Sequence, residues 1–247
     1  MRGRQTQIIS ILSDRKKITV LELAELLKVS DVTIRKDLAI LEEKGLLKRE
    51  HGFATMPESD DVSTRMIFSY EIKRKIAQKA LESIKDGETL MIESGSCCAL
   101  LAEEIVLNRR GITIITNSIF IANFLRDKVG ARIILLGGEF QPESQVMIGP
   151  LIKKCAENFN VDKIFMGTDG FNDVGAMSGD LMRAEAVRNM KKSTRQAIIL
   201  TESKKFTQSG IVPLINYGEI DFIYTDDKIS EDKRNFLEDK GVKVILA

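Results

Sequence analysis

The first fifty residues place apolar side chains at helical spacing, interrupted by short polar turns. Residues 4–14 predict a first helix, and Ile18 predicts a short strand after it. Thr19 then caps a second helix over 20–27, because a threonine hydroxyl accepts a hydrogen bond from a free backbone N–H of the first turn.

A third helix follows the tight turn at 28–29 and begins at the capping residue Ser30. Ile34, Leu38 and Leu41 fall at i, i+4 and i+7, so they form one buried stripe. The opposite face stays polar. Two helices joined by so short a turn are typical of a helix-turn-helix unit.

A hairpin marked by glycine follows the third helix, which ends near Gly45. Residues 46–49 and 53–55 are each short enough to form one strand of a wing around His51 and Gly52. The pattern therefore predicts an α+β winged helix-turn-helix domain over residues 1–56.

Beyond residue 56 the pattern changes. The acidic stretch Pro57–Asp61 has no periodicity and predicts a linker, which we extend over 57–70, and a helix is expected over 69–84. Strand-like apolar runs cover 89–93, 112–116, 132–136, 163–167, 197–201, 222–225 and 242–246. Helical segments separate most of them, at 99–107, 119–126, 152–158, 181–193 and 231–240. This alternation predicts an α/β domain over 71–247 with a mostly parallel sheet covered on both faces.

The composition is that of an ordinary globular protein, with 247 residues, 43% hydrophobic and 30% charged positions and a net charge of +1. No apolar run approaches the roughly 20 residues of a membrane helix, and the N-terminus does not look like a signal peptide. We expect a cytoplasmic protein with no membrane partner.

Cys97 and Cys98 are adjacent, and the three cysteines form no disulfide framework or zinc spacing. His51, in the expected wing, is the only histidine, so no His-based catalytic triad or His-rich metal site can form in the larger domain. We expect no metal and no cofactor.

The outward face of the third helix carries donors suited to DNA. Arg35 and Lys36 can reach phosphates or guanine edges, and Thr33, near the capping Ser30, can contact phosphate or a thymine methyl group. The wing adds three basic or polar groups, at Lys48, Arg49 and His51. The alternative is a helical module used only for dimerisation, with a solvated polar face. Residues 1–50 hold 11 lysines and arginines against 8 acids, an excess too small to decide the question by itself.

Three loops of small polar residues follow successive strands of the larger domain. They are Ser94-Gly95-Ser96, Thr116-Asn117-Ser118 and Gly137-Gly138. Strand-end loops of an open α/β sheet gather at one edge, where hydroxyls and free N–H groups can bind an anion. One such loop can be ordinary turn chemistry, but three favour a small polar ligand.

The order of these residues resembles a known family. After Arg4, Ile8 and Leu12, a gap of 17 residues leads to Ser30 and then to the run Thr33-Ile34-Arg35-Lys36-Asp37-Leu38. This is similar, position by position, to the helix-turn-helix signature of the DeoR family of bacterial transcription regulators. Asp37 is an acid on the helix expected to face DNA, and we expect it to orient Arg35 or a backbone group.

The likeness continues through the larger domain. The family's motifs correspond to Glu93–Ser96, Thr116–Ser118, Leu136–Gly138, Gly149-Pro150, Gly167–Gly170, Glu185-Ala186 and Ser203–Phe206. Sensor domains of this family resemble ribose-5-phosphate isomerase in fold and respond to phosphorylated sugars. The resemblance implies phosphate contacts at Ser94, Gly95, Ser96, Asn117 and Lys205, with Asp169 and Glu185 on sugar hydroxyls. This chain departs from the pattern at Glu93, where Asp is usual, at Cys97 and Cys98, which replace threonine-like residues, and at Gln141, where a basic residue is common.

The resemblance implies a repressor of a carbohydrate or polyol catabolic operon. Its partners would be double-stranded operator DNA, a small phosphorylated sugar as effector, and further copies of the chain. We expect a dimer or tetramer, because one winged helix reads too few base pairs to be selective.

Two alternatives come from other classes. An isomerase-like enzyme could use Asp169, Glu185 and Lys205 in proton transfer, although we expect no catalytic activity. A redox regulator could act through Cys97 and Cys98 if their thiols were exposed and had a lowered pKa.

Overall fold

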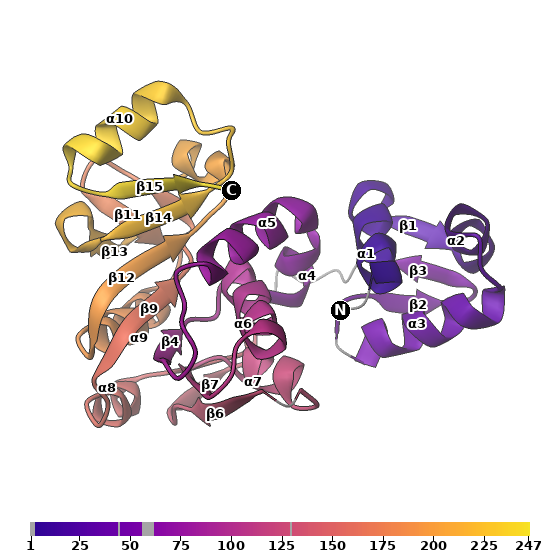
Figure 1. Ribbon diagram of the computed structural model, residues 1–247, viewed down its shortest axis with the longest axis horizontal. Coiled ribbons are helices and arrows are strands. Elements are labelled where there is room, and N and C mark those ends of the chain that lie inside the picture. The colour runs from indigo at the N-terminus through magenta and orange to yellow at the C-terminus, as the bar shows by residue number, and fades with distance from the viewer. Residues whose placement is uncertain (1–2, 44, 56–61, 129) are drawn as a thin grey trace. The chain divides into compact units, whose positions relative to one another are not determined.

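The computed structural model describes residues 3–43, 45–55, 62–128 and 130–247. The expected linker at Pro57–Asp61 lies outside these residues. The chain divides into two compact units, Met1–Glu71 and Ile72–Ala247, which Figure 1 traces from indigo to yellow.

The first unit is a small helical body with a three-stranded sheet. Its described elements are α1 (Gly3–Arg15), β1 (Lys17–Thr19), α2 (Val20–Leu27), α3 (Asp31–Glu43), β2 (Lys48–Glu50), β3 (Phe53–Thr55) and α4 (Val62–Ile67). The strands are antiparallel, with β3 between β1 and β2. The three expected helices, the strand at Ile18 and the wing are confirmed. The interpretation of 57–70 as a linker did not anticipate α4, which contacts α1.

Local hydrogen bonds explain where these helices begin and end. Thr19 and Glu22 form a reciprocal capping box at the start of α2. At its end Lys28 adopts a left-handed conformation (φ 54°), and the Val29 N–H donates to the carbonyl of Ala24. Gly45 ends the third helix in the same way, with a φ of 70°.

The second unit is built on a seven-stranded parallel sheet. The sheet strands are β4 (Thr89–Ile92), β5 (Ile112–Thr116), β6 (Ala131–Leu135), β9 (Val161–Met166), β12 (Thr194–Leu200), β14 (Phe222–Thr225) and β15 (Lys243–Leu246). Their spatial order is β15-β14-β12-β9-β4-β5-β6, and all neighbours are parallel. The predicted parallel α/β sheet is confirmed.

Helices cover both faces of this sheet. They are α5 (Tyr70–Leu81), α6 (Ser96–Asn108), α7 (Ile119–Leu125), α8 (Pro150–Ala156), α9 (Leu181–Lys191) and α10 (Glu231–Asp239). α6 and α7 contact β4, β5 and β6. On the other face Met91, Ile164 and Ile199 share a core with Ile152 of α8 and Ala184 of α9. Burial on both faces explains why the strands are continuous apolar runs.

Two small antiparallel sheets and two 3₁₀ turns were not anticipated. The added elements are β7 (Glu139–Gln141), β8 (Val146–Ile148), β10 (Gly170–Phe171), β11 (Gly175–Ser178), η1 (Ser203–Thr207), β13 (Val212–Asn216) and η2 (Tyr217–Glu219). β7 pairs with β8, and β11 lies between β10 and β13. Gly175 permits the second pairing, because a β-carbon there would collide with the carbonyl oxygen of Ile215 on β13.

Candidate functional site

The outward face of α3 presents the side chains expected to meet DNA. Ile34 and Leu38 are fully buried, whereas Arg35 and Lys36 are exposed. An ion pair with Asp31, 3.7 Å from the Arg35 Nε, steadies the arginine along the helix. The N-terminal half of α3 therefore offers cationic groups to solvent, at the helix end that enters the major groove in helix-turn-helix proteins.

Ser30 and Thr33 also stabilise the start of this helix. The Ser30 Oγ accepts a hydrogen bond from the Thr33 N–H at 3.3 Å, so it caps α3 as expected. The two hydroxyl oxygens are 2.8 Å apart and share one hydrogen bond. Each hydroxyl keeps capacity for a further partner, and their contacts with DNA stay a prediction.

The wing is also exposed and basic. Lys48, Arg49 and His51 all face solvent, and His51 and Gly52 form the tip with positive φ. Arg49 donates from its backbone N–H (2.9 Å) and from Nε (2.5 Å) to the carboxylate of Glu42. Burial would raise the pKa of Glu42, but these bonds from Arg49 bring it below the usual value. The pair ties the wing to the end of α3.

The expectation for Asp37 is corrected. Its side chain is buried, and it pairs with Arg4 of α1 and not with Arg35. Gln5 adds a hydrogen bond of 3.3 Å to the same carboxylate. Asp37 therefore locks α3 against α1, which sets the angle at which the outward face is presented.

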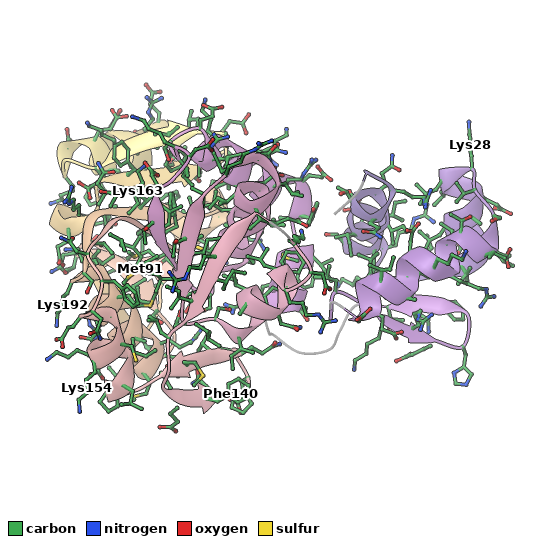
Figure 2. The ribbon with its side chains drawn as sticks, turned by 60° about the horizontal axis from the view of Figure 1, so that its bottom comes forward. Lys28, Met91, Phe140, Lys154, Lys163 and Lys192 are labelled. Atoms are coloured by element: carbon green, nitrogen blue, oxygen red, sulfur yellow. The ribbon has the colours of Figure 1, made fainter. Side chains whose placement is uncertain are left out.

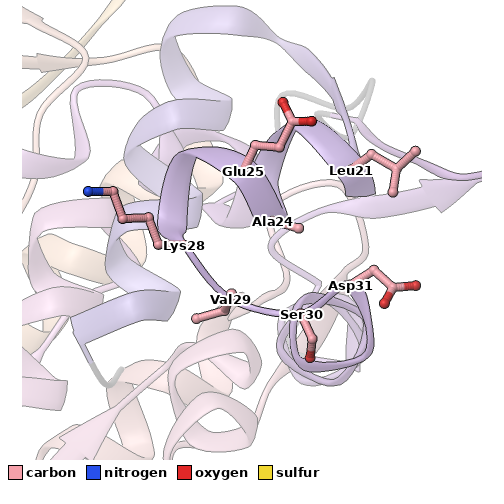
Figure 3. Close-up of a pocket in the computed structure, with 7 residues that line it drawn as sticks. All are labelled: Leu21, Ala24, Glu25, Lys28, Val29, Ser30 and Asp31. Atoms are coloured by element: carbon pink, nitrogen blue, oxygen red, sulfur yellow. The ribbon is translucent and has the colours of Figure 1, made fainter.

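A shallow, open hollow of about 440 Å³ lies at the helix-turn-helix turn (Figure 3). Its lining residues are Leu21, Ala24, Glu25, Lys28, Val29, Ser30 and Asp31. It belongs to the first unit and not to the edge of the large sheet where the ligand is expected.

In the second unit, the strand order reverses between β4 and β9. The chain runs from β4 outward to β5 and β6, and then returns to β9 on the other side of β4. Two loops leave the sheet at this point, one beginning at Glu93 and one at Gly167. Ligands of open α/β sheets bind at such switch points, outside the carboxyl ends of the strands.

Glu93 joins these two loops. Its Oε2 accepts hydrogen bonds from the N–H groups of Gly95 (2.9 Å) and Gly167 (3.0 Å), and its Oε1 accepts from the Ser94 hydroxyl (2.7 Å). The Ser94 hydroxyl therefore builds the loop. The glutamate side chain is long enough to bridge both sides of the switch point.

The loop after β4 leads into a helix whose first turn is not capped by a side chain. Gly95 occupies the capping position of α6 and makes no side-chain hydrogen bond there. Ser96 follows it, half-buried. The free N–H groups of such a turn favour an anion.

Cys97 and Cys98 lie in this turn with both thiols buried. Burial raises the pKa of Cys97 to about 12 and that of Cys98 well above its ordinary value. Since the thiolate is the reactive form, this environment does not favour the redox regulator.

The loop after β5 leaves one acceptor without a partner. The Asn117 amide donates to the Met147 carbonyl at 3.1 Å, and its buried Oδ1 accepts no hydrogen bond in the described structure. Thr116 accepts from the Ser118 N–H (3.0 Å), and Ser118 caps α7. These two hydroxyls shape the turn, and their contacts with a ligand remain predictions. A free carbonyl oxygen at Asn117 suits a hydroxyl better than a phosphate.

The glycine pair after β6 has a packing role at one position. A β-carbon at Gly138 would collide with the Ile148 carbonyl oxygen of β8, whereas one at Gly137 would only reach ordinary contact with the Cys155 Sγ, at 4.0 Å. Nearby, Gln141 of β7 donates to the Asp180 Oδ2 at 3.2 Å. This bond connects the β7–β8 hairpin to the capping residue of α9.

Among the described residues, no hydrogen bond or ion pair joins Asp169, Glu185 and Lys205 to one another. Asp169 accepts from the Gly179 N–H at 2.7 Å and lies 3.6 Å from Arg183. Glu185 is exposed on α9 and Lys205 is half-buried on η1. Neither makes a side-chain hydrogen bond or ion pair within the described ranges.

The sequence interpretation missed a buried lysine beside the α6 turn. The Lys73 Nζ on α5 lies 3.4 Å from the Glu202 carboxylate, and the two side chains are only 4% and 7% exposed. Lys204 approaches the same carboxylate at 2.7 Å. Burial lowers the pKa of Lys73, opposed by Glu202, and Lys73 also interacts electrostatically with Cys97 in the first turn of α6. Lys73 falls within the amphipathic pattern of a helix, so nothing in the sequence indicated that it would be buried beside Glu202.

Two lysines thus approach one carboxylate at this edge of the sheet, and Asp226 lies close enough to influence Cys97 as they do. η1, which carries Lys204 and Lys205, is fastened by Ser203. Both the N–H and the hydroxyl of Ser203 donate to Asp226 at 2.7 Å. Burial would raise the pKa of Asp226, but these bonds hold it below the usual value.

In the described residues no helix is both long and apolar enough to span a membrane. Within the same residues no group of three or more His, Cys, Asp or Glu side chains could hold a metal ion. A winged helix-turn-helix unit joined to an α/β unit with a polar switch point defines a ligand-responsive DNA-binding regulator as the class of this protein.

Comparison with known families gives the same class. Residues 4–60 match the DeoR-like helix-turn-helix domain and residues 69–227 match the DeoR C terminal sensor domain. The chain therefore belongs to the DeoR family of transcription regulators.

Similar proteins are transcription regulators by name. The HTH-type transcriptional regulator GolR of Listeria innocua is 32% identical over 99% of this chain and 98% of its own length. The glycerol-3-phosphate regulon repressor of Escherichia coli is 31% identical over 90% of each chain. Among solved structures, ribose 5-phosphate isomerase A from Neisseria gonorrhoeae aligns with a TM-score of 0.41 at 16% identity, covering 55% of this chain and 53% of that one.

Proposed function

We propose that this protein represses a carbohydrate or polyol catabolic operon and leaves its operator when a phosphorylated sugar binds the second unit. The observation that carries the proposal is the positive charge of Lys73 and Lys204 beside the uncapped first turn of α6. A partly buried site that combines lysine side chains with free N–H donors suits a phosphate group.

The phosphate would lie at the loop of Ser94, Gly95 and Ser96, within reach of Lys73 and Lys205. The unpartnered Oδ1 of Asn117 would accept from a sugar hydroxyl. Asp169 and Glu185 would take further hydroxyls. A sugar phosphate combines the required anion and hydroxyl donors in one small molecule.

The names of relatives support a role in sugar metabolism. They include the glycerol-3-phosphate regulon repressor of Escherichia coli and a lactose phosphotransferase system repressor of Staphylococcus epidermidis. We place the DNA contacts at Ser30, Thr33, Arg35, Lys36, Lys48, Arg49 and His51. Two or four copies of the chain in the cytoplasm would present paired winged helix-turn-helix units to one operator.

Ligand binding and operator release test this proposal together. A panel of sugar phosphates is screened by thermal shift, and each stabilising compound is titrated into a gel-shift assay with operator duplex. We expect at least one compound to stabilise the protein and to release DNA. Its non-phosphorylated sugar should do neither.

Lys73→Met tests the phosphate site. The variant should still bind operator but lose most of the response to the compound. Lys163→Met is the matched control, because Lys163 is also a part-buried lysine paired with a glutamate, Glu88, but at the opposite end of the strands. It should respond like the wild type.

Three results would contradict the proposal. They are a wild type that responds to no sugar phosphate, a Lys73→Met variant with a normal response, and turnover of a pentose or hexose phosphate above background. The last result would favour the isomerase-like enzyme.

A further inference from the structure

One aliphatic side chain occupies the outermost position of the first turn of α3. Val32 is 57% exposed. It precedes the buried Ile34 by two residues, about 200° around a helix, so it points away from the core. Lys36 lies one turn further along the same outward line. Nothing in the described part of the first unit covers Val32.

Exposure of a single valine is not unusual by itself. Its position is what distinguishes it. Asp31 and Arg35 pair on one flank of the turn, and the hydroxyls of Ser30 and Thr33 share a hydrogen bond on the other. The polar groups beside Val32 are thus held to its sides, and the two methyl groups of Val32 form the apolar crest between them.

The geometry of helix-turn-helix recognition places this crest against base edges. The first turn of the recognition helix enters the major groove. Helical side chains lean toward the N-terminus, and the χ1 angle of valine is nearly fixed in a helix. Val32 would therefore meet the floor of the groove in one conformation, with little entropy to lose.

Only one base presents an apolar group there. The thymine 5-methyl group lies on the major-groove edge, where the other bases offer hydrogen-bond donors and acceptors. We propose that Val32 reads a thymine 5-methyl group in each operator half-site. The proposal rests on the DNA-binding role proposed above and adds a specificity-determining residue to it.

Replacement of thymine by deoxyuridine tests the contact, because it removes the methyl group and keeps the base pair. Binding sites are first selected from a random duplex library with the full-length wild-type protein. Each thymine of the selected site is then replaced singly by deoxyuridine, and dissociation constants are measured. One position per half-site should lose about three- to tenfold in affinity.

The Val32→Ala variant completes the comparison. It should bind the thymine site about three- to tenfold more weakly and show no further loss with deoxyuridine at that position. Its salt dependence should match that of the wild type, because no phosphate contact is removed. Leu26→Ala on α2, another exposed aliphatic position, is the control and should keep the full deoxyuridine penalty.

Each outcome bears on one proposal or the other. A wild type indifferent to every deoxyuridine substitution, a selected site without thymine, or a penalty unchanged in Val32→Ala would overturn the role of Val32 and leave DNA binding intact. Failure of the wild type to select any sequence would overturn the repressor proposal as well.

Discussion

At the scale of single residues, Lys28 is the most strained position in the helix-turn-helix turn. It is a non-glycine residue in the left-handed region, with φ 54° and ψ 46°. Such a conformation costs about 1–2 kcal/mol for a residue with a β-carbon. The Lys28 side chain projects outward from the first unit (Figure 2), so the strain is not offset by packing.

We therefore predict that Lys28→Gly stabilises the first unit by about 0.5–1 kcal/mol, after allowing for the greater freedom of glycine in the unfolded chain. Hydrogen exchange of the Val29 amide, which bonds to Ala24 across this turn, measures the change. Lys28→Ala is the control, because it removes the charge but keeps the β-carbon. Equal stabilisation in both variants would show that strain is not the cause.

At the scale of elements, the bond from η1 to β14 holds the lysine-bearing turn in place. Ser203 of η1 contributes both of its donors to Asp226, the residue that follows β14. The lowered pKa of Asp226 means that its ionised form is favoured by folding.

This shift gives a pH dependence with a definite sign. A carboxyl group whose pKa is lowered by folding contributes stability above its unfolded value, about 3.9, and that contribution is lost as the pH falls through the lowered folded pKa. We predict that Asp226→Asn destabilises the second unit at pH 7 and that the difference from the wild type shrinks below about pH 4.

Denaturant unfolding across this pH range checks the prediction, with the exposed neighbour Asp227 as control. Asp227→Asn should follow the wild type throughout. A destabilisation by Asp226→Asn that stays constant down to the lowest pH would contradict the assignment.

The missed elements share a physical cause at this same scale. β10 spans only Gly170–Phe171, and β13 contains Pro213, which cannot donate to a neighbouring strand. β13 pairs only with β11, so the proline is tolerated at an edge. Neither strand has the length or alternation that a sequence pattern needs.

At the scale of the whole molecule, the two compact units should unfold separately. Tyr217 and Tyr224 lie in the second unit, whereas Tyr70 lies near the end of the first. In a Tyr70→Phe background, tyrosine fluorescence therefore follows the second unit, whereas helical circular dichroism follows both. We predict two thermal transitions. A bound sugar phosphate should increase the free energy of unfolding of the second unit alone, by about 2.7 kcal/mol at one hundred times its Kd. Only the transition reported by tyrosine should then move to higher temperature.

A single transition seen alike by both probes would contradict this expectation. An equal shift of both transitions would do so too, because it would mean that the ligand stabilises the DNA-binding unit as much as its own. Inorganic sulfate at the same ionic strength serves as the control for charge screening.

The sequence alone determined the elements whose signals are local. Caps at Thr19 and Ser30, apolar spacing in α3 and continuous apolar strands depend on neighbouring residues, and each was predicted within a few positions. The DeoR signature likewise spans contiguous motifs. From these features the fold class, the winged helix-turn-helix domain and the strand-end loops could be predicted.

Only the tertiary structure decided which distant side chains meet. Asp37 pairs with Arg4 across 33 positions, and Lys73 meets Glu202 across a still longer interval. The orphaned acceptor of Asn117 and the reach of Glu93 to Gly167 likewise depend on the strand order of the sheet. Periodicity reports the burial of an element, but the partner of a buried charge depends on how the elements pack, and that is set by the whole chain.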